Sequence, residues 1–241
     1  MRRLEDTHWW FVARRNLVLT ALRRVLRASA PPPAGGRPRH ILDVGCGTGA
    51  MLTQLRPFGR VVGLDREPLA LQFCRERGHR DLVCASATVL PFADNAFDVI
   101  VALDVIEHIA DDKAALREIA RVLVPGGHAF LTVPAYRSLW SGHDVALMHQ
   151  RRYVAREVKQ LALGAGLRVS RVSYTVSALL PLVGAIRLAQ RLQKNRPVRA
   201  DAVPTARPLN ALLRAYLDWE SRLALRARLP FGLTVFAIVT K

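Results

Sequence analysis

The chain has 241 residues, 51% of them hydrophobic, which allows a sizeable buried core and excludes a disordered composition. Three cysteines without disulfide or metal-ligand spacing indicate free thiols in a reducing compartment. The formal net charge is +17, distributed as +7 over residues 1–40, −3 over 41–135 and +13 over 136–241. The basic flanks fit either an anionic partner or Arg-rich solvated faces.

The first predicted element is a helix over Trp9–Ala28, where apolar side chains recur at helical spacing. The segment before it is interrupted by charges and lacks the apolar run of a signal peptide. Residues 28–39 are rich in proline and glycine, which indicates a linker. We therefore predict a basic N-terminal helix and linker over residues 1–39.

Short apolar runs then alternate with helical runs, which predicts an α/β core over residues 40–175 with a parallel sheet. Helices should cover both faces of this sheet. The predicted strands span residues 40–44, 60–64, 81–84, 97–103, 128–133 and 167–174. The predicted helices span residues 50–56, 68–77, 112–123 and 155–163.

The alternation stops after residue 175, where we predict a basic and apolar helical cap over residues 176–229. Its helices are expected at 176–194 and 210–229, joined by a proline-containing connector at 195–208. A final strand is expected at 233–239, within a last core segment over 230–241. The longest uncharged stretch is shorter than the ~20 residues of a membrane span. This predicts a cytoplasmic protein, with peripheral contact at the inner membrane face as an alternative.

The motif LDVGCGTG, residues 42–49, follows a predicted strand and opens a predicted helix. Gly45, Gly47 and Gly49 allow a tight turn and a close approach of the backbone to a ligand. Free N–H groups at the helix start suit the same ligand. Asp65 ends the second strand and can accept hydrogen bonds from ribose hydroxyls. This pattern predicts a nucleotide-type site, for either a dinucleotide or S-adenosylmethionine (SAM).

The order of the motifs separates these two ligands. LDVGCGTG is followed by VVGLDREPLAL, ATVLPFADNAFDVIVALDVIEHI, LREIARVLVPGG and HAFLTVP. Over residues 41–134 this order resembles the class I SAM-dependent methyltransferases, in particular the branch that methylates small molecules and lipid-type quinone precursors. HWWF, the RRY loop and LPFGLTVFAIVTK also look like a distinct bacterial methyltransferase group. The resemblance implies SAM as cofactor and a Rossmann-like sheet of seven strands, the last antiparallel after a helical insertion.

Carried over by position, the resemblance implies cofactor contacts at the ends of several strands. Asp65 should bind the ribose hydroxyls, and Asp104 should face the methionine end of SAM. Ser86 stands where relatives usually carry an acid for the adenine amino group, and it can accept a hydrogen bond without that charge. The implied cofactor-binding residues are Asp43, Gly45, Cys46, Gly47, Gly49, Asp65, Arg66, Ser86, Ala87 and Asp104.

The segment SGHDVALMHQRRY, residues 141–153, follows the fifth strand and should border the substrate, because ligands sit beyond the carboxyl ends of parallel strands. His143, Asp144 and His149 are candidate catalytic bases near neutral pH. Alternatively, the segment is a polar loop that caps the helix starting near Ala155. The candidate substrate-binding residues, suited to an anionic group, are Arg151, Arg152, Tyr153 and His108.

Two further motifs are open to a structural and a functional interpretation. HWWF, residues 8–11, either covers the cofactor or packs the first helix onto the core. Glu107 and His108 either begin a helix or contribute to a metal site. One histidine beside carboxylates is a weak metal signal, so no metal site is predicted.

The sequence therefore favours an enzyme that transfers a methyl group from SAM to a small-molecule or lipid-linked acceptor. An RNA methyltransferase and a non-catalytic SAM-binding protein are the alternatives. Nucleic acid is the weaker choice of partner, because LDVIEH follows the fourth strand in place of an Asn/Asp-Pro-Pro-aromatic motif and no RNA-binding module is recognisable. Nothing in the sequence indicates an oligomeric state.

Overall fold

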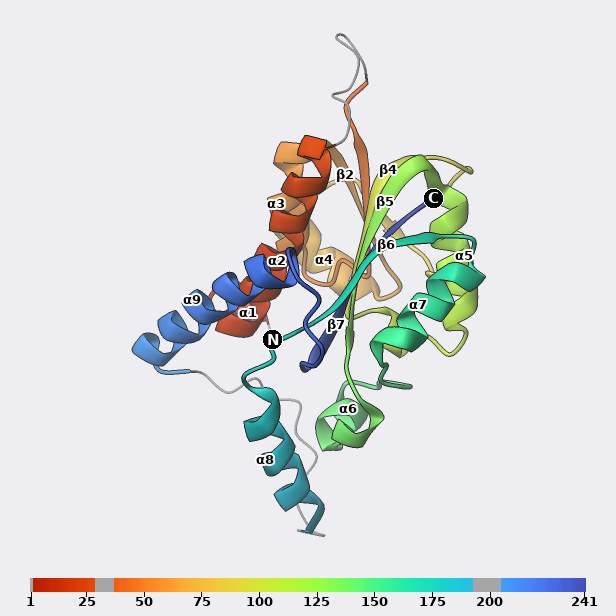
Figure 1. The fold of residues 1–241 in the computed structure, drawn as a ribbon. Coiled ribbons are helices and arrows are strands. Elements are labelled where there is room, and N and C mark those ends of the chain that lie inside the picture. Colours follow the sequence, from red (N-terminus) through yellow and green to blue (C-terminus); the bar gives the residue numbers. More distant parts are fainter. Residues whose placement is uncertain (1, 29–36, 193–204) are drawn as a thin grey trace.

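The computed structural model describes residues 2–28, 37–192 and 205–241. Most of the predicted linker at 28–39 and connector at 195–208 lies outside these residues. The described chain forms a seven-stranded sheet in the order β3-β2-β1-β4-β5-β7-β6 (Figure 1). The strands are β1 (His40–Val44), β2 (Arg60–Asp65), β3 (Leu82–Cys84), β4 (Phe97–Leu103), β5 (Leu123–Pro134), β6 (Arg168–Thr175) and β7 (Thr234–Thr240).

Strands β1 to β5 pair in parallel, whereas β7 runs antiparallel to both β5 and β6. The predicted Rossmann-like sheet with an antiparallel last strand is therefore confirmed. One strand boundary differs from its predicted position by more than one residue, because β5 begins at Leu123 rather than at residue 128. The sequence Val124–Gly127 contains proline and two glycines and indicates a turn, but a register shift between Phe97 and Val99 lets the strand continue through it.

Helices cover both faces of the sheet, as the alternating pattern predicts (Figure 1). The aliphatic side chains of α5 (Asp112–Val122) and α7 (Ala155–Gly164) pack in one buried cluster with β1, β4 and β5. A second cluster on the other face joins α2 (Trp9–Ala28) and α3 (Ala50–Leu55) to the sheet. Helix α4 (Pro68–Glu76) packs beside β2 and β3 through Leu71 and Cys74. The two short helices are α1 (Arg2–Glu5) and α6 (Gly142–Ala146).

The predicted cap contains two helices in different positions (Figure 1). Helix α8 (Leu180–Leu192) extends away from the sheet, whereas α9 (Arg207–Ala224) lies beside α2. Asn210 Oδ1 accepts a hydrogen bond from the Trp9 amide at 2.8 Å, and Asn16 Nδ2 donates to Asp218 Oδ1 at 2.9 Å. The N-terminal and C-terminal parts of the chain therefore form one layer on this face of the sheet.

A buried glutamate fixes the junction between β6 and α9. Glu220 is 2% exposed and accepts hydrogen bonds from the amides of Val176 and Ser177 and from the Tyr216 hydroxyl. Val176 itself has a φ of 63°, a conformation that strains a β-branched residue. These hydrogen bonds hold the chain in that conformation as it leaves the sheet. Among the described residues, no helix combines the length and apolar character needed to cross a membrane.

Phe130→Ala should test the central position of β5. Phe130 is 0% exposed and belongs to the cluster that joins α2 and α3 to the sheet. We expect its truncation to lower the free energy of unfolding by about 3–5 kcal/mol in urea denaturation. Val89→Ala is the control, because Val89 is 71% exposed and should change stability by less than about 0.5 kcal/mol. Equal effects of the two changes would contradict this description of the core.

Candidate functional site

The glycine loop between β1 and α3 is shaped for a close backbone approach. Gly45 has a φ of 68°, and a Cβ there would lie 2.4 Å from Val105 Cγ2. Gly47 has a φ of 53°, and a Cβ there would have no neighbouring atom within 4 Å. The amides of Gly45 and Cys46 donate to the Leu64 carbonyl at 2.7 and 3.0 Å. The loop is therefore anchored to β2 on one side and open at Gly47.

The Asp65 carboxylate is positioned at this opening. Its Oδ2 accepts from the Gly47 amide at 2.9 Å, and its Oδ1 accepts from the Glu67 amide at 2.9 Å. A carboxylate has about four lone-pair positions, so two amide donors leave acceptor capacity for hydroxyl groups of a ligand. The geometry therefore fits the predicted ribose contact of Asp65.

Asp43 is a buried acidic residue at the start of the glycine motif. It is 2% exposed, and within the described residues its Oδ2 has no hydrogen-bond partner. Burial raises the pKa of this carboxyl well above its usual range, and the nearby Asp65 adds to the increase. A buried acceptor without a donor is costly in a folded protein, so this oxygen suits a donor on a ligand. The residues of the loop thus fit SAM.

Asp104 directly follows β4 and is paired with a residue that the sequence analysis did not single out. Arg14, on α2, forms an ion pair with Asp104, and Thr132 Oγ1 donates to Asp104 Oδ1 at 2.8 Å. Burial lowers the pKa of Arg14 to about 10, and its Nε has no hydrogen-bond partner in the described part of the chain. An arginine with a free donor beside the glycine loop suits a ligand carboxylate. Its sequence signal was weak, because Arg14 lies within a helix full of arginines.

The N-terminal segment also reaches the glycine loop. Thr48 Oγ1 donates to the Glu5 carboxylate, and Arg77 pairs with Asp6 at 3.0 Å and with Glu5 at 3.5 Å. Arg15 Nη1 donates to the Glu5 carbonyl at 2.8 Å. Glu5 is therefore held between the loop and the start of α2, a position that local sequence patterns do not indicate.

The remaining predicted cofactor contacts lie around the carboxyl ends of β2 and β3. The side chains of Arg66 and Ser86 are exposed, and Ser86 Oγ hydrogen bonds to the Thr88 hydroxyl at 2.8 Å. Ala87 is buried in the core. The Cys46 side chain packs with Cys74 under the loop, so only its backbone faces the site. The residues predicted to contact the adenine, Arg66 and Ser86, are thus exposed, and position 86 carries a serine rather than an acidic residue.

Asp144 organises the loop after β5. It is 0% exposed and accepts from Arg152 Nε at 2.7 Å, from His149 Nδ1 at 2.9 Å and from the Ser141 amide at 2.9 Å. Burial alone would raise the pKa of Asp144, but the hydrogen bonds from His149 and Arg152 outweigh it and hold that pKa well below its usual range. The carboxylate therefore orients His149 and stays ionised at neutral pH.

Three of the four predicted substrate-binding residues are engaged within the fold. Arg152 is 7% exposed and binds Asp144, whereas Tyr153 is 3% exposed and donates its hydroxyl to Asp112 Oδ2 at 2.9 Å. Arg151 Nη1 donates to the same Asp112 oxygen at 2.9 Å. Burial strongly raises the pKa of the Tyr153 hydroxyl, and the Asp112 charge adds to it. In this structure Arg151 and Tyr153 hold the loop against the start of α5, whereas Arg152 binds Asp144 within the loop and the Ala135 carbonyl at the end of β5.

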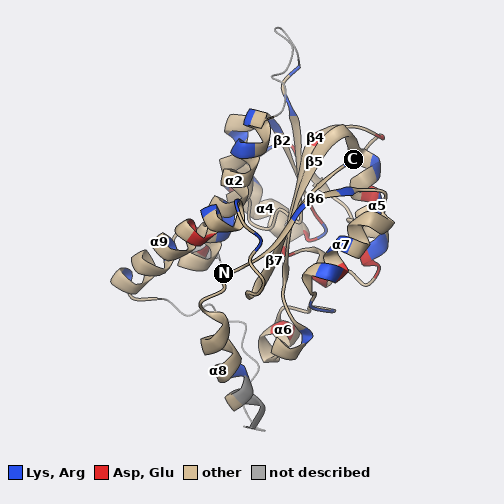
Figure 2. Ribbon diagram, in the orientation of Figure 1, with Lys and Arg blue, Asp and Glu red and all other residues tan. Residues whose placement is uncertain are grey.

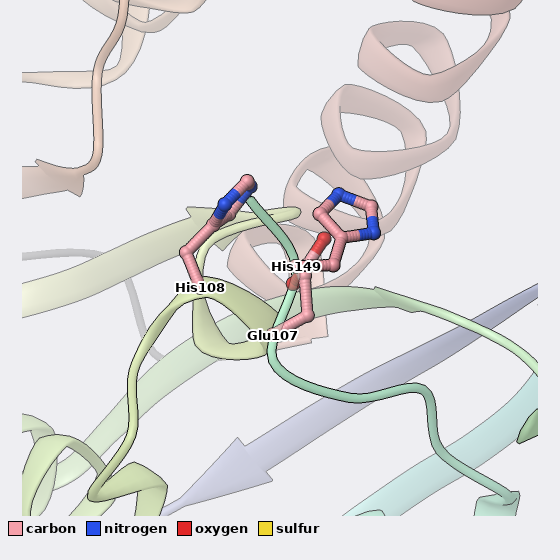
Figure 3. Close-up of side chains that lie close together, drawn as sticks. All are labelled: Glu107, His108 and His149. Carbon is pink, nitrogen blue, oxygen red and sulfur yellow. The ribbon is translucent and has the colours of Figure 1, made fainter. Parts of the chain in front are cut away.

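His108 and His149 lie side by side although they are 41 positions apart in the sequence. Their rings lie 4.7 Å apart at 84°, and Glu107 points toward them from the turn Ile106–His108 (Figure 3). Glu107 is 0% exposed, and burial raises its pKa to about 8. Burial, with the neighbouring His149 and Arg66, lowers the pKa of His108 to about 4. The sequence indicated Glu107 with His108 but not the addition of His149.

His143 is half-buried on the same loop, at the start of α6. Burial lowers its pKa, and the positive charge of Arg187 contributes to the decrease. Arg187 comes from α8 and hydrogen bonds to Ser141 Oγ, which also accepts from the His143 amide at 3.2 Å. His143 is therefore neutral at neutral pH and lies where α8 meets the loop.

Comparison with known proteins shows that the central segment is similar to methyltransferases. Residues 42–131 match the methyltransferase domain family. A "Probable S-adenosylmethionine-dependent methyltransferase" of Mycolicibacterium smegmatis is 33% identical over 135 residues, which cover 54% of this chain and 52% of that protein. "Probable tRNA methyltransferase 9B" of Homo sapiens is 38% identical over 96 residues, 39% of this chain and 21% of that protein.

A solved structure of a SAM-dependent methyltransferase from Archaeoglobus fulgidus shares the fold. It superposes with a TM-score of 0.56 at 18% identity, and the match covers 94% of each chain. By contrast, this chain spans about half or less of the length of the curated relatives that it matches first. The relatives therefore identify the domain around the glycine loop.

Asp65→Ala should weaken binding of SAM by about 1–3 kcal/mol, because it leaves ribose hydroxyls without an acceptor and frees the Gly47 amide. Isothermal titration calorimetry measures the effect. Asp81→Ala is the matched control, since Asp81 is an exposed acid that pairs with Arg60 at the start of β2 and β3. Equal affinities of the two variants would contradict the ribose contact.

Asp144→Asn should destabilise the fold, because it leaves Arg152 buried without its counter-charge. We expect the free energy of unfolding to fall by about 3–5 kcal/mol in urea denaturation at pH 7. Asp111→Asn is the control, since Asp111 caps α5 through the Ala114 amide and asparagine caps a helix equally well. A neutral result for Asp144→Asn would mean that Asp144 does not hold the loop.

Proposed function

We propose that this chain transfers a methyl group from SAM to a small-molecule or lipid-linked acceptor, because residues 42–131 match the methyltransferase domain family. One observation carries this proposal. The glycine loop with Asp43, the ribose-type carboxylate of Asp65 and the Arg14–Asp104 pair all lie at the carboxyl edge of the sheet, beside a loop with two histidines.

SAM supplies a methyl group already activated by a positively charged sulfur. The protein then has to bind, align and exclude water, and such positioning can lower a barrier by about 7–11 kcal/mol. Asp65 accepts from ribose hydroxyls, while Arg14, Asp43 and Asp104 bind the charged amino-acid end. These assignments put the methyl group toward the loop after β5, because Asp104 directly follows the neighbouring strand β4.

The acceptor side offers two proton acceptors. His143 is neutral at neutral pH and can take a proton from an acceptor hydroxyl or ammonium group. His149 is oriented by Asp144 through Nδ1, which leaves Nε2 with a lone pair. A base is needed only if the acceptor carries a proton on the reacting atom, so the two histidines fit O- and N-methylation alike.

Exposed apolar side chains on α8 support a lipid-linked acceptor. Leu182 is 58% exposed and Ile186 45% exposed, and Phe231, before β7, is 48% exposed. Arg187 on the same helix hydrogen bonds to Ser141 beside His143. An acceptor with an apolar tail along α8 could therefore present its polar end to His143, and peripheral membrane contact would use the same surface.

A tRNA acceptor is the second candidate function. The 38% identity to "Probable tRNA methyltransferase 9B" and the net charge of +17 favour it. Within the part of the chain that the structure describes, basic residues are spread over α2 and α9 on one side of the sheet and α7 on the other (Figure 2). This distribution makes the small or lipid-linked acceptor the stronger choice.

Transfer of labelled methyl groups from SAM into a fractionated bacterial extract tests the proposal. Lipids, small metabolites, RNA and protein are separated after incubation, with the Asp65→Ala variant as the low-binding control. We expect label in the lipid or metabolite fraction. Label in RNA would establish the second candidate, and no label above the control in any fraction would contradict methyl transfer.

Replacing both His143 and His149 by alanine should reduce methyl transfer to the acceptor so found by about 10²–10⁴-fold. Binding of SAM, measured by calorimetry, should persist because neither residue belongs to the glycine loop. His40→Ala, at the opposite end of β1, is the control for removal of a histidine. Unchanged rates in the double variant would assign the loop a purely structural role.

A further inference from the structure

We propose that Glu107, His108 and His149 bind a divalent transition-metal ion at the carboxyl edge of β4. One ligand atom from each of the three side chains lies within 4.8 Å of the others (Figure 3). The proposal concerns a site separate from the SAM contacts, and ion binding does not depend on which acceptor is methylated.

Glu107 gives the first argument. Its side chain is fully buried, and neither carboxylate oxygen has a hydrogen-bond partner among the described residues. Buried carboxyl groups in folded proteins are almost always hydrogen bonded, paired or bound to a metal. Its carboxylate points toward the ring of His149 (Figure 3), so both oxygens are available on the side where the two imidazoles lie.

His149 gives the second argument, through its partner Asp144. Asp144 is ionised between Arg152 and His149 and can only accept hydrogen bonds, so the His149 Nδ1 must carry the proton. The Nε2 of the neutral ring is then a lone-pair donor. A carboxylate that orients an imidazole through its other nitrogen is the usual outer partner of a metal-binding histidine.

His108 is held in a similar way by the backbone. The backbone of Leu147 and Met148, just before His149, lies beside its ring. A neutral imidazole carries a proton on one ring nitrogen and a lone pair on the other, so His108 can offer one ligand nitrogen. The same loop therefore orients both imidazoles, and the perpendicular rings avoid stacking that would block their nitrogens.

The ligand set indicates the kind of ion. Two imidazole nitrogens and one carboxylate suit first-row ions such as Zn²⁺, Co²⁺, Mn²⁺ or Fe²⁺ rather than Ca²⁺. Opposite ligands of a six-coordinate ion lie about 4.2 Å apart, so small side-chain rotations would bring all three onto one ion. Three protein ligands leave positions open for water or a substrate oxygen.

An ion with open positions lowers the pKa of a bound hydroxyl or water. It would thus favour an acceptor that is methylated on oxygen, a consequence that rests on the proposed function. In that arrangement His149 holds the ion, and His143 remains the proton acceptor.

Titration of the metal-stripped full-length chain with Co²⁺ tests the site through the visible absorption of the bound ion. We expect one Co²⁺ per chain, displaced by Zn²⁺. Glu107→Gln and His149→Ala should each weaken Co²⁺ binding by more than about 100-fold, beyond the loss typical of an outer partner. His40→Ala, which removes a histidine at the far end of β1, should bind Co²⁺ unchanged.

Circular dichroism and SAM calorimetry on the same samples separate loss of the site from loss of the fold. If Glu107→Gln does not fold, His108→Ala provides the same comparison. The absence of Co²⁺ binding, or equal binding by wild type and Glu107→Gln, would overturn the proposal and leave Glu107 as a buried uncharged acid. Because neither titration needs an acceptor, failure of methyl transfer would not be mistaken for failure of the metal site.

Discussion

The structure depends on the parallel pairing of β1, β2, β4 and β5. Parallel strands end at the same edge of a sheet, so residues that follow separate strands in the sequence arrive at one place. Asp43, Asp65 and Asp104 share this edge for that reason. The antiparallel β7 continues the sheet beyond β5 and brings the C-terminal segment to the same side as α2.

This convergence concentrates negative charge in a protein that is strongly basic as a whole. Asp43, Asp104 and Glu107 gather near Arg14, and Glu107 also lies near Arg152. Desolvation makes each extra negative charge costly, which is why burial raises the pKa of both Asp43 and Glu107. An acidic interior of this kind favours cationic ligands, and a sulfonium or a metal ion fulfils that electrostatic requirement. The excess of positive charge in residues 1–40 and 136–241 instead affects the charge of the outer surface.

Local patterns were sufficient to predict the parallel strands and the glycine loop, whereas the antiparallel last strand was implied by the family resemblance. The motif LDVGCGTG carries its own turn chemistry, and strand–helix alternation depends on short-range periodicity. The early start of β5 was missed because Pro125 and the following glycines resemble a turn, and only the pairing with Phe97 and a bulge makes that segment a strand. The local sequence therefore predicts that a strand or helix is present more accurately than it predicts the residue at which that element begins.

Sequence patterns did not predict the direction in which individual side chains point. Arg152 and Tyr153 stand where substrate ligands were expected, but their partners Asp144 and Asp112 turn them inward, and no periodicity encodes those pairings. Contacts between distant segments were equally hidden. Arg14 meets Asp104 across 90 positions of sequence, and His149 meets His108 only because residues 141–153 fold back over the end of β4.

The first residues of the chain are attached to the glycine loop in a particular way. Glu5 and Asp6 reach Thr48 and Arg77 through charged and polar groups, and Asp6 is largely exposed. Dissolved ions screen such contacts far more than they weaken apolar packing. A higher ionic strength should therefore weaken the contacts that attach the N-terminal segment to the glycine loop. The rate at which the cofactor is exchanged for its demethylated product would then depend on salt concentration as well as on the residues of the site.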